Sequence, residues 1–418
     1  MTGGRTEAES CQLAMHVYQL GFNSINVSNG VYASDMIHQV IAPMFTDHAL
    51  NMEAAMNIKK PVSCPVLVAN RINNPGMAET LIAMGKTDFV CMGRGSIVDP
   101  DLPNKAKEGR FDEINYCLGC LQGCGNSLFF KGYVDCLVNP RCGLEYTDDM
   151  TPVNKGKKVM VIGGGPAGLM AARTAAQKGH KVTVFEKDSY LGGAFRAAAY
   201  PMGKGELATV ISSYRAQCEK LGVEIRMNAE VSEETIREFA PEAIIIATGS
   251  RPLMPAIGGI DSPNVVTAED ILYGTKEPQQ GPVVVCGGEV GGETAEFIAE
   301  TSYFPVTILE MQGEILKDMA FQNKPSLMGM LAAKNVSIIT NAKVSAITEN
   351  SVSYTDANGE TVTIPAATVV SAFGCRAYNP LQETAEKLCS EVYVAGSAVK
   401  AGNAMTAIKE GYEAAMKL

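Results

Sequence analysis

The feature that most constrains the fold of this chain is a glycine-rich turn between an apolar run and a helical pattern. The run Val159–Ile162 is followed by three glycines, a helical pattern to Lys178, and a second apolar run that ends at Glu186. This order of strand, turn, helix and strand is that of a dinucleotide-binding unit in a parallel α/β sheet. A glycine-rich turn without a ligand is the competing interpretation, but strand, helix and terminal acid all accompany the turn here.

Each position of this turn has a physical task. Gly163 permits the tight turn, Gly165 lets the backbone approach a pyrophosphate, and Gly168 lets the helix pack on the strand. The pyrophosphate lies at the helix N-terminus, where free N–H groups and the helix dipole favour an anion. Glu186, 18 residues beyond Gly168, can accept hydrogen bonds from a ribose diol. The predicted nucleotide contacts are Gly163, Gly165, Pro166, Ala167, Gly168 and Glu186.

Two further segments favour FAD as the dinucleotide at this turn. Gly192 and Gly193 are adjacent glycines that let the chain pass close to a cofactor. The buried-strand pattern Ile244–Ala247 ends in the small residues Thr248 and Gly249. Either segment alone would be an ordinary loop, but together with the first turn they predict an FAD site.

A second dinucleotide motif begins at Val283. Gly288 and Gly291 are predicted to contact the nucleotide, while Cys286 occupies the position expected for the first glycine, so the turn there must tolerate a Cβ atom. Glu310 ends the next apolar run 22 residues after Gly288, where a carboxylate accepts from the 2′-hydroxyl of NAD and repels the 2′-phosphate of NADP. The next residue is a methionine and not an arginine, so NADH is favoured over NADPH.

Five of the twelve cysteines fall within 26 residues. Cys117, Cys120, Cys124 and Cys136 have the spacing C-x2-C-x3-C-x11-C, in which a wrapping loop can present four thiolates to the corners of a [4Fe–4S] cluster. Tetrahedral zinc is the alternative, but zinc sites usually use two paired knuckles and only one C-x2-C pair is present. Beside two dinucleotide motifs a redox cluster has a use that structural zinc lacks. These four cysteines are therefore the predicted metal ligands, and Cys142 is the spare.

Composition argues against several classes of function. A formal net charge of −10 argues against a nucleic-acid partner, because nucleic-acid affinity rests largely on clustered Lys and Arg. No stretch reaches the roughly 18 uninterrupted apolar residues of a membrane span, and the first ten residues lack a signal-segment pattern, so we expect a soluble cytoplasmic protein without a membrane partner. Cys218, Cys286, Cys375 and Cys389 are single, so the cysteine pair of a disulfide reductase is missing. Electrons from FAD are expected to leave through the cluster.

With these motifs in this order, the chain resembles the iron–sulfur flavoenzymes of the NADH:flavin oxidoreductase group, which includes 2,4-dienoyl-CoA reductase, 2-enoate reductase and trimethylamine dehydrogenase. The resemblance covers essentially all 418 residues, and Cys136–Pro140 matches the family segment at the fourth cluster ligand. It implies a TIM barrel that carries FMN, then the cluster, then an FAD domain interrupted by an NAD(P)H domain. Apolar runs at 23–28, 65–70 and 88–93 alternate with helical patterns, as expected for the last strands of such a barrel.

The resemblance assigns further residues. It implies that Arg71, Gly93 and Arg94, at the ends of barrel strands seven and eight, hold the FMN phosphate. Gly396 and Ser397 belong to the closing FAD motif, and Ser397 stands where the family usually has an aspartate.

The first residues resemble the middle of such a barrel. Gly3–Thr6 match the loop after strand five, which implies that roughly five strands, the family's tyrosine proton donor and most of its FMN contacts are absent. Tyr32 aligns with a position that faces the flavin and is the catalytic candidate, with a packed aromatic as the alternative. FMN is therefore expected in the intact family, and this chain alone is not expected to retain it.

The sequence thus predicts an α/β protein in four parts. These are the C-terminal part of an FMN-type (β/α)8 barrel at 1–112, an iron–sulfur segment at 113–150, an FAD-binding domain at 151–280 and 372–418, and an NAD(H)-binding domain at 281–371. NADH is expected to reduce FAD, and the cluster to pass electrons toward FMN and an activated alkene of the enoate or enoyl-CoA type. The expected partners are therefore NADH and a small unsaturated substrate.

Two alternatives remain at this point. One is a diaphorase-like electron-transfer component that serves an electron-accepting protein, such as a separate partner carrying the missing half-barrel. The other is an inactive truncated fragment that binds nucleotide without turnover. The sequence also leaves a homo-oligomer open.

Overall fold

The computed structural model describes residues 4–31 and 40–418, and the chain divides into two compact units, Met1–Glu145 and Tyr146–Leu418. Both units are built from parallel strands and helices, as the sequence predicts. No helix within the described residues is long and apolar enough to cross a membrane.

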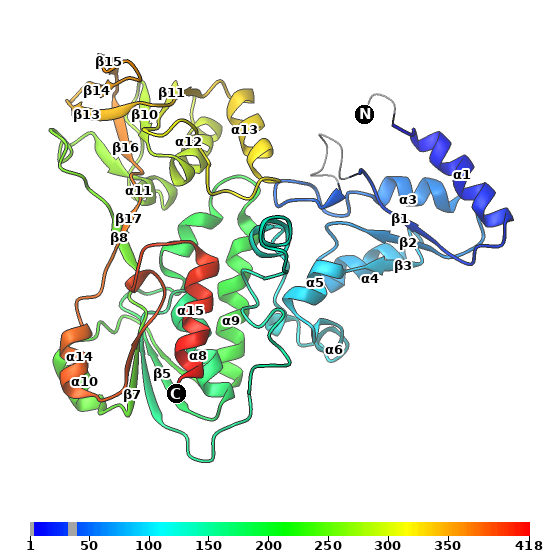
Figure 1. Ribbon diagram of the computed structural model, residues 1–418, viewed down its shortest axis with the longest axis horizontal. Helices are drawn as coiled ribbons and strands as arrows, with labels where there is room; N and C mark the ends of the chain where they lie inside the picture. The colour runs from blue at the N-terminus through cyan, green and yellow to red at the C-terminus, as the bar shows by residue number, and fades with distance from the viewer. Residues whose placement is uncertain (1–3, 32–39) are drawn as a thin grey trace. The chain divides into compact units, whose positions relative to one another are not determined.

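The first unit contains a three-stranded parallel sheet with the order β1-β2-β3 (Figure 1). Strands β1 (Ile25–Val27), β2 (Val66–Ala69) and β3 (Phe89–Cys91) lie inside the three predicted apolar runs. Val66 and Val68 of the middle strand are fully buried, as in a parallel strand covered on both faces. Within the described residues β1 and β3 each pair only with β2, so each leaves one edge of the sheet unpaired.

Within the described residues, five helices accompany this sheet. The first begins at a capping box, in which Thr6 accepts from the backbone of Glu9 and the Glu9 carboxylate accepts from the backbone of Thr6. The helices are α1 (Glu7–Gln19), α3 (Met52–Lys59), α4 (Pro75–Ala83), α5 (Gly93–Val98) and α6 (Leu102–Lys107).

The cysteine-rich segment follows and has little regular structure. Its elements are short: a 3-10 turn η1 (Phe111–Glu113), a π-helical turn η2 (Gln122–Ser127) and the one-turn helix α7 (Leu128–Lys131). No described residue between these elements and the end of the first unit belongs to a strand. Regular hydrogen bonding therefore contributes little to holding this segment together.

The second unit contains two parallel sheets of five strands each. The first has the order β18-β7-β4-β5-β6, and its central strands are apolar on both faces. Its strands are β4 (Lys158–Ile162), β5 (Lys181–Phe185), β6 (Glu224–Arg226), β7 (Ala243–Ile246) and β18 (Val392–Val394). Helix α15 packs along α8 beside this sheet (Figure 1). The helices of this part are α8 (Pro166–Gln177), α9 (Ala208–Lys220), α10 (Glu233–Phe239), α14 (Gln382–Leu388) and α15 (Ala404–Met416).

The second sheet has the order β12-β11-β10-β16-β9. Its strands are β9 (Val265–Thr267), β10 (Val283–Cys286), β11 (Val306–Leu309), β12 (Ser337–Ile339) and β16 (Thr368–Ser371). Its helices are α11 (Ala268–Leu272), α12 (Glu289–Thr301) and α13 (Lys324–Ala333), and a separate antiparallel sheet is formed by β13 (Lys343–Ile347), β14 (Ser351–Thr355) and β15 (Thr361–Pro365). Because β9 pairs with β16, this sheet begins before the domain boundary expected at residue 281.

Two short antiparallel strands lie between the parts of the chain that form the two sheets. They are β8 (Ser250–Pro252), which leaves the first sheet, and β17 (Cys375–Ala377), which returns toward it, with Arg251 paired to Arg376. The chain therefore enters and leaves the second sheet through one paired ribbon.

Candidate functional site

The first glycine-rich turn joins β4 to α8, and close backbone approaches require its glycines. Gly163 has a φ of +107°, and a Cβ atom there would overlap the carbonyl oxygen of Ala247. A Cβ atom at Gly168 would overlap the carbonyl oxygen of Gly163, so a larger residue would push α8 away from the sheet. At Gly165 no described atom lies within 4 Å of the Cβ position, and α8 begins at Pro166. This open space at a helix N-terminus suits a pyrophosphate.

Glu186 follows β5 and lies beside this turn. It is buried, its Oε2 accepts from the N–H of Gly164 at 2.8 Å, and its Oε1 accepts from the N–H of Asp188 at 2.9 Å. These two bonds fix the carboxylate, which still has lone pairs for the hydroxyls of a ribose.

The loop Gly192–Gly193 lies against the same turn. The N–H of Gly192 donates to the carbonyl oxygen of Gly164 at 2.9 Å, and both loop glycines have positive φ, +108° and +49°. The Cβ position of Gly193 is 3.8 Å from the Cα of Gly165. The structure therefore brings Gly192–Gly193 against Gly164–Gly165, although the two pairs lie far apart in the sequence.

Thr248 and Gly249 follow β7 and are tied to the returning chain. The Thr248 hydroxyl donates to the carbonyl oxygen of Tyr378 at 2.6 Å, and the N–H of Tyr378 donates to the carbonyl oxygen of Gly249 at 3.0 Å. No described atom lies within 4 Å of the Cβ position of Gly249. These bonds give Thr248 a positioning role that the sequence did not suggest.

Gly396 and Ser397 form a short 3-10 turn, η5 (Gly396–Ala398), after β18. A Cβ atom at Gly396, where φ is +67°, would lie 2.8 Å from the Cβ of Ala167, and one at Gly411 would overlap the Ala167 carbonyl oxygen. Sequence reasoning missed Gly411, although an isolated glycine within a helical pattern is a known signal of close approach. Helix α15 thus needs this glycine to approach the start of α8.

The second glycine-rich turn joins β10 to α12 and corrects one prediction. Cys286 is not in the turn, because it is the last residue of β10, pairs with Leu309 and is fully buried. The left-handed residue is Gly287, with a φ of +132°, where a Cβ atom would overlap the carbonyl oxygen of Ala372. The expectation that Cys286 occupies the first-glycine position is therefore wrong. Gly287 makes the close approach that Gly163 makes in the first turn.

Glu310 lies beside the second turn as Glu186 lies beside the first. Gly288 precedes α12 and Gly291 is buried in its first turn. The Cβ position of Gly288 is 2.8 Å from Oε2 of Glu310, whose Oε1 accepts from the N–H of Gln312 at 2.7 Å. The two turns therefore present equivalent carboxylates, each directly after the strand that follows the helix of its turn.

A buried ion pair joins the two parts of the second unit, and sequence reasoning missed it. Lys204 Nζ lies 2.6 Å from Oε1 of Glu293 on α12, and the two side chains are 8% and 14% exposed. Burial raises the pKa of Glu289, one turn earlier on the same helix, and the charge of Glu293 acts in the same direction. The start of α12 therefore carries a local excess of acidic groups that Lys204 partly neutralises.

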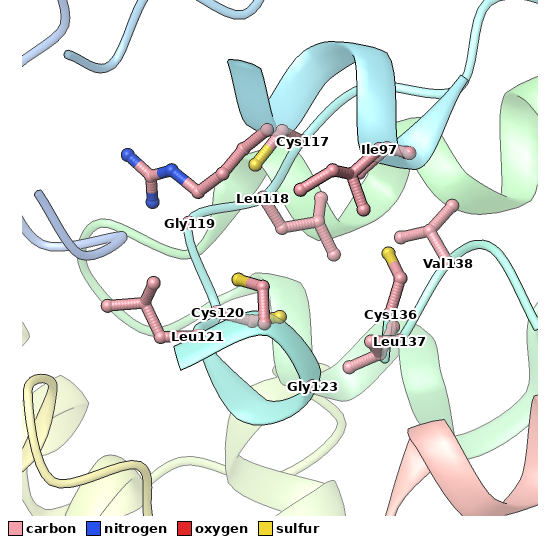
Figure 2. A pocket seen from close by; sticks show the side chains of 13 residues that line it. Ile97, Cys117, Leu118, Gly119, Cys120, Leu121, Gly123, Cys136, Leu137 and Val138 are labelled. Atoms are coloured by element: carbon pink, nitrogen blue, oxygen red, sulfur yellow. The ribbon is translucent and has the colours of Figure 1, made fainter. Parts of the chain in front are cut away.

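The four predicted metal ligands converge on one pocket in the first unit. Cys117, Cys120, Cys124 and Cys136 all line it, and Figure 2 shows the sulfur atoms of three of them around one hollow. The remaining lining is mostly apolar and includes leucine, isoleucine and valine side chains. Cys142 is not among the described residues that line this pocket.

The zinc alternative requires four cysteine side chains arranged around a single ion. Within the described residues no three His, Cys, Asp or Glu side chains are placed to hold a single metal ion. Four thiolates around one zinc ion would lie about 3.8 Å apart, from Zn–S distances of about 2.3 Å. A polynuclear cluster has its ligands on different irons and hence farther apart.

Cys117 and Cys136 are buried, Cys120 and Cys124 are half-buried, and backbone N–H groups donate to Cys120 and Cys136. Burial raises the pKa of Cys120 to about 12 and that of Cys136 well above its usual value. Hydrogen bonds from the N–H of Gln122 to Cys120, and from those of Val138 and Asn139 to Cys136, oppose this rise. Bonds of this kind stabilise thiolates and help set the potentials of iron–sulfur clusters.

The backbone around these cysteines is held in close and unusual conformations. Leu121 has a φ of +56° and is fully buried at the start of η2. A Cβ atom at Gly123 would overlap the carbonyl oxygen of Asp135, so the two cysteine-bearing segments lie in direct contact there. Left-handed non-glycine residues concentrate at functional sites, where the surrounding structure fixes them.

Of the residues expected at the FMN phosphate, Arg71 is committed to other partners. It is buried, and its guanidinium donates to the carbonyl oxygens of Thr46 at 3.1 Å, Met44 at 2.9 Å and Leu118 at 3.4 Å. These bonds tie the end of β2 to the cysteine segment.

The other expected residues of the barrel have different surroundings. Gly93 begins α5, and Nη1 of Arg94 donates to the carbonyl oxygen of Ala42 at 2.8 Å. Arg94 also lines the cysteine pocket, a placement that no sequence pattern indicated. Tyr32, the catalytic candidate, lies outside the described residues.

Comparisons with known families match both units. Residues 157–411 match the family described as "Pyridine nucleotide-disulphide oxidoreductase", and residues 1–113 match the "NADH:flavin oxidoreductase / NADH oxidase family". The junction between the two matches contains the four cysteines of the pocket.

Comparisons with individual proteins extend over nearly the whole chain. NADH oxidase of Thermoanaerobacter brockii is 36% identical, over 100% of this chain and 64% of the relative. Cinnamate reductase of Clostridium sporogenes is 32% identical, over 99% of this chain and 62% of the relative. A solved complex of 2-naphthoyl-CoA reductase with 2-naphthoyl-CoA matches with a TM-score of 0.93 and 32% identity, over 100% of this chain and 64% of that one. The chain thus spans less than two thirds of the length of these relatives.

Proposed function

This chain belongs to the NADH:flavin oxidoreductase and 2-enoate reductase family and carries a pyridine nucleotide-disulphide oxidoreductase domain, and we propose that it moves electrons from NADH through FAD and a [4Fe–4S] cluster. The destination we propose is FMN and an activated alkene of the enoate or enoyl-CoA class. The observation that carries this proposal is the convergence of four cysteines on one pocket in a chain with two dinucleotide turns. Flavins supply hydride and one-electron chemistry, and the protein supplies binding, orientation and electrostatics.

The first turn of the second unit is the proposed FAD site. Its open N-terminal space suits the pyrophosphate, and Glu186 is placed for a ribose. The loop Gly192–Gly193 closes against the turn and would bring backbone N–H groups near the cofactor.

The second turn is the proposed NADH site. Glu310 stands where a carboxylate accepts from the 2′-hydroxyl of NAD, and the adjacent Met311 is 68% exposed and brings no positive charge for a 2′-phosphate. We place the NAD(H)-binding domain between β8 and β17, so that it includes β9.

The cysteines of the second unit do not form a dithiol pair that could accept electrons from FAD. No cysteine of the described residues is in a disulfide, and Cys218, Cys286 and Cys389 are buried at separate places in the fold. Cys375 is exposed on the edge ribbon. The pocket of the first unit is therefore the proposed route for single electrons.

A second candidate is an NADH-dependent electron-transfer component that serves a separate protein. It is favoured by the three-stranded sheet of the first unit, whose outer strands have unpaired edges in the described residues. Unpaired edges are rarely left open in folded proteins, so strands from elsewhere would be expected to cover them.

The test is the cofactor content of protein purified without oxygen. We expect FAD by mass spectrometry, about four irons with matching sulfide per chain, and bleaching of the flavin absorbance on addition of NADH. Zinc in place of iron would contradict the cluster, and flavin that NADH does not bleach would contradict the enzyme. Alkene reduction distinguishes the two candidates, because an electron-transfer component reduces ferricyanide without reducing cinnamate.

A further inference from the structure

Arg94 lies at the pocket of the four cysteines. It is the one charged side chain among the described residues that line the pocket, where its neighbours are apolar side chains and glycines. Nη1 donates to the carbonyl oxygen of Ala42 at 2.8 Å, which anchors one side of the guanidinium. The arginine acts on its surroundings as a fixed positive charge.

Arg94 lies in the same lining as the cysteines. Arg94, Cys117, Cys120, Cys124 and Cys136 all line one pocket, and the side chains between them are apolar. The other arginine expected at the FMN phosphate, Arg71, does not line the pocket and donates to three carbonyl oxygens. The two arginines therefore have different surroundings: Arg71 is held by backbone carbonyls, and Arg94 is part of the lining of the cysteine pocket.

We propose that Arg94 is a positioning residue that raises the reduction potential of the cluster held by Cys117, Cys120, Cys124 and Cys136. This inference rests on the proposed function, since it needs a cluster in the pocket. One-electron reduction adds one negative charge to the cluster and its thiolates, while no bond forms or breaks. A fixed positive charge at the pocket stabilises the reduced form more than the oxidised form, and it does so strongly where apolar walls exclude water.

The experiment is a redox titration of the cluster, followed by its low-temperature electron paramagnetic resonance signal in protein stripped of FMN. Removing FMN separates this effect from any loss of phosphate binding. For Arg94→Gln we expect at least a tenfold lower ratio of reduced to oxidised cluster at a fixed ambient potential, which is 59 mV for a one-electron couple. Arg94→Lys keeps the charge and should stay within threefold of the wild type.

A matched control and a second variant make the result decisive. Arg110→Gln removes an arginine of the same unit that pairs with exposed Glu108 and does not line the pocket, and it should leave the ratio unchanged. Arg94→His carries a group that titrates near neutral pH. The reduction potential of the cluster in this variant should therefore fall more steeply between pH 5.5 and pH 8.5 than that of the wild-type cluster.

Each outcome decides a different point. Full iron content with a wild-type ratio in Arg94→Gln would overturn the inference and leave the proposed function standing. Loss of iron in every Arg94 variant, Lys included, would also overturn it, since Arg94 would then hold the loop and not tune the cluster. Iron missing from the wild-type protein would contradict the proposed function and this inference together.

Discussion

At the scale of single residues, two carboxylates do equivalent work in different sheets. Glu186 follows β5 and accepts from two backbone N–H groups, and Glu310 follows β11 and accepts from the N–H of Gln312, each beside a glycine-rich turn. Because both are buried, neither carboxylate is free to turn away from a bound nucleotide. The identity of the dinucleotide at each turn is therefore decided by what a fixed negative charge accepts and repels.

Glu310 should make the protein prefer NADH. We expect the specificity constant for ferricyanide reduction to favour NADH over NADPH at least tenfold, about 1.4 kcal/mol. Glu310→Gln should narrow this preference, because the neutral amide no longer repels the 2′-phosphate. Glu186→Gln is the matched control, which should lower FAD content and leave the preference per bound FAD unaltered. Equal constants for the two nucleotides in the wild type would rule the assignment out.

Cys124 and Cys142 should differ in their effect on iron. Cys124 lines the pocket and Cys142 does not, although both lie in the cysteine-rich segment. Cys124→Ala should remove most of the iron measured in anaerobically purified protein, since one of four anchoring thiolates is lost. Cys142→Ala should keep it. If Cys142→Ala loses iron while Cys136→Ala retains it, the fourth ligand has been misassigned.

At the scale of elements, the position of each glycine-rich turn depends on the residue at which the preceding strand ends. Strand β4 ends before its first glycine, and β10 runs through Cys286 because that residue still pairs with Leu309 and Ser371. The left-handed position then falls on Gly287. A cysteine beside the turn is therefore no obstacle, because its side chain lies in the sheet core.

Gly287→Ala should lower the free energy of unfolding far more than the same substitution at Gly359, another glycine with a positive φ. The φ of +132° at Gly287 is strained for alanine, and the new Cβ atom would overlap the Ala372 carbonyl oxygen, for a combined cost of about 2–5 kcal/mol. Gly359 has a φ of +83° with open space around its Cβ position, so Gly359→Ala should cost only about 1–2 kcal/mol. Urea unfolding and the KM for NADH measure both, and equal losses in the two variants would refute the explanation.

The elements that sequence reasoning placed well are those with a local signal. Apolar runs bounded by turn residues predicted β1, β2 and β3, and the acid after each second strand predicted Glu186 and Glu310. The sequence alone did not show that Gly287 takes the first-glycine position of the second turn. That position depends on where β10 ends, which is set by pairing with neighbouring strands. The partners of Arg71 and Arg94 come from residues far away in the sequence, so no local pattern could reveal them.

At the scale of the whole molecule, the two units differ in how complete their sheets are. The second unit has two five-stranded parallel sheets, each with its glycine-rich turn and terminal acid. The first unit has three parallel strands in its described residues, whereas closure of a TIM barrel takes eight. Functions that depend on the second unit should therefore survive in this polypeptide alone.

The 418-residue polypeptide should keep FAD and NADH-dependent ferricyanide reduction without retaining FMN or reducing an alkene. Arg71 is committed to backbone carbonyls, and an open three-stranded sheet cannot enclose a flavin ring. Flavins released by acid and separated by chromatography, with an anaerobic assay on cinnamate, measure this. Near-equal FMN and FAD with alkene turnover would show that the described strands suffice, and adding a polypeptide with the other barrel strands should otherwise restore FMN.

The paired ribbon of β8 and β17 has a consequence for how such a chain could arise. Because the two strands run side by side, the chain departs from the first sheet and rejoins it at neighbouring points. A stretch of gene encoding everything between them could be gained or lost in one recombination event, and the remaining ends would already be close enough to join. A lineage could therefore exchange its pyridine-nucleotide module at the ribbon without rebuilding the flavin domain.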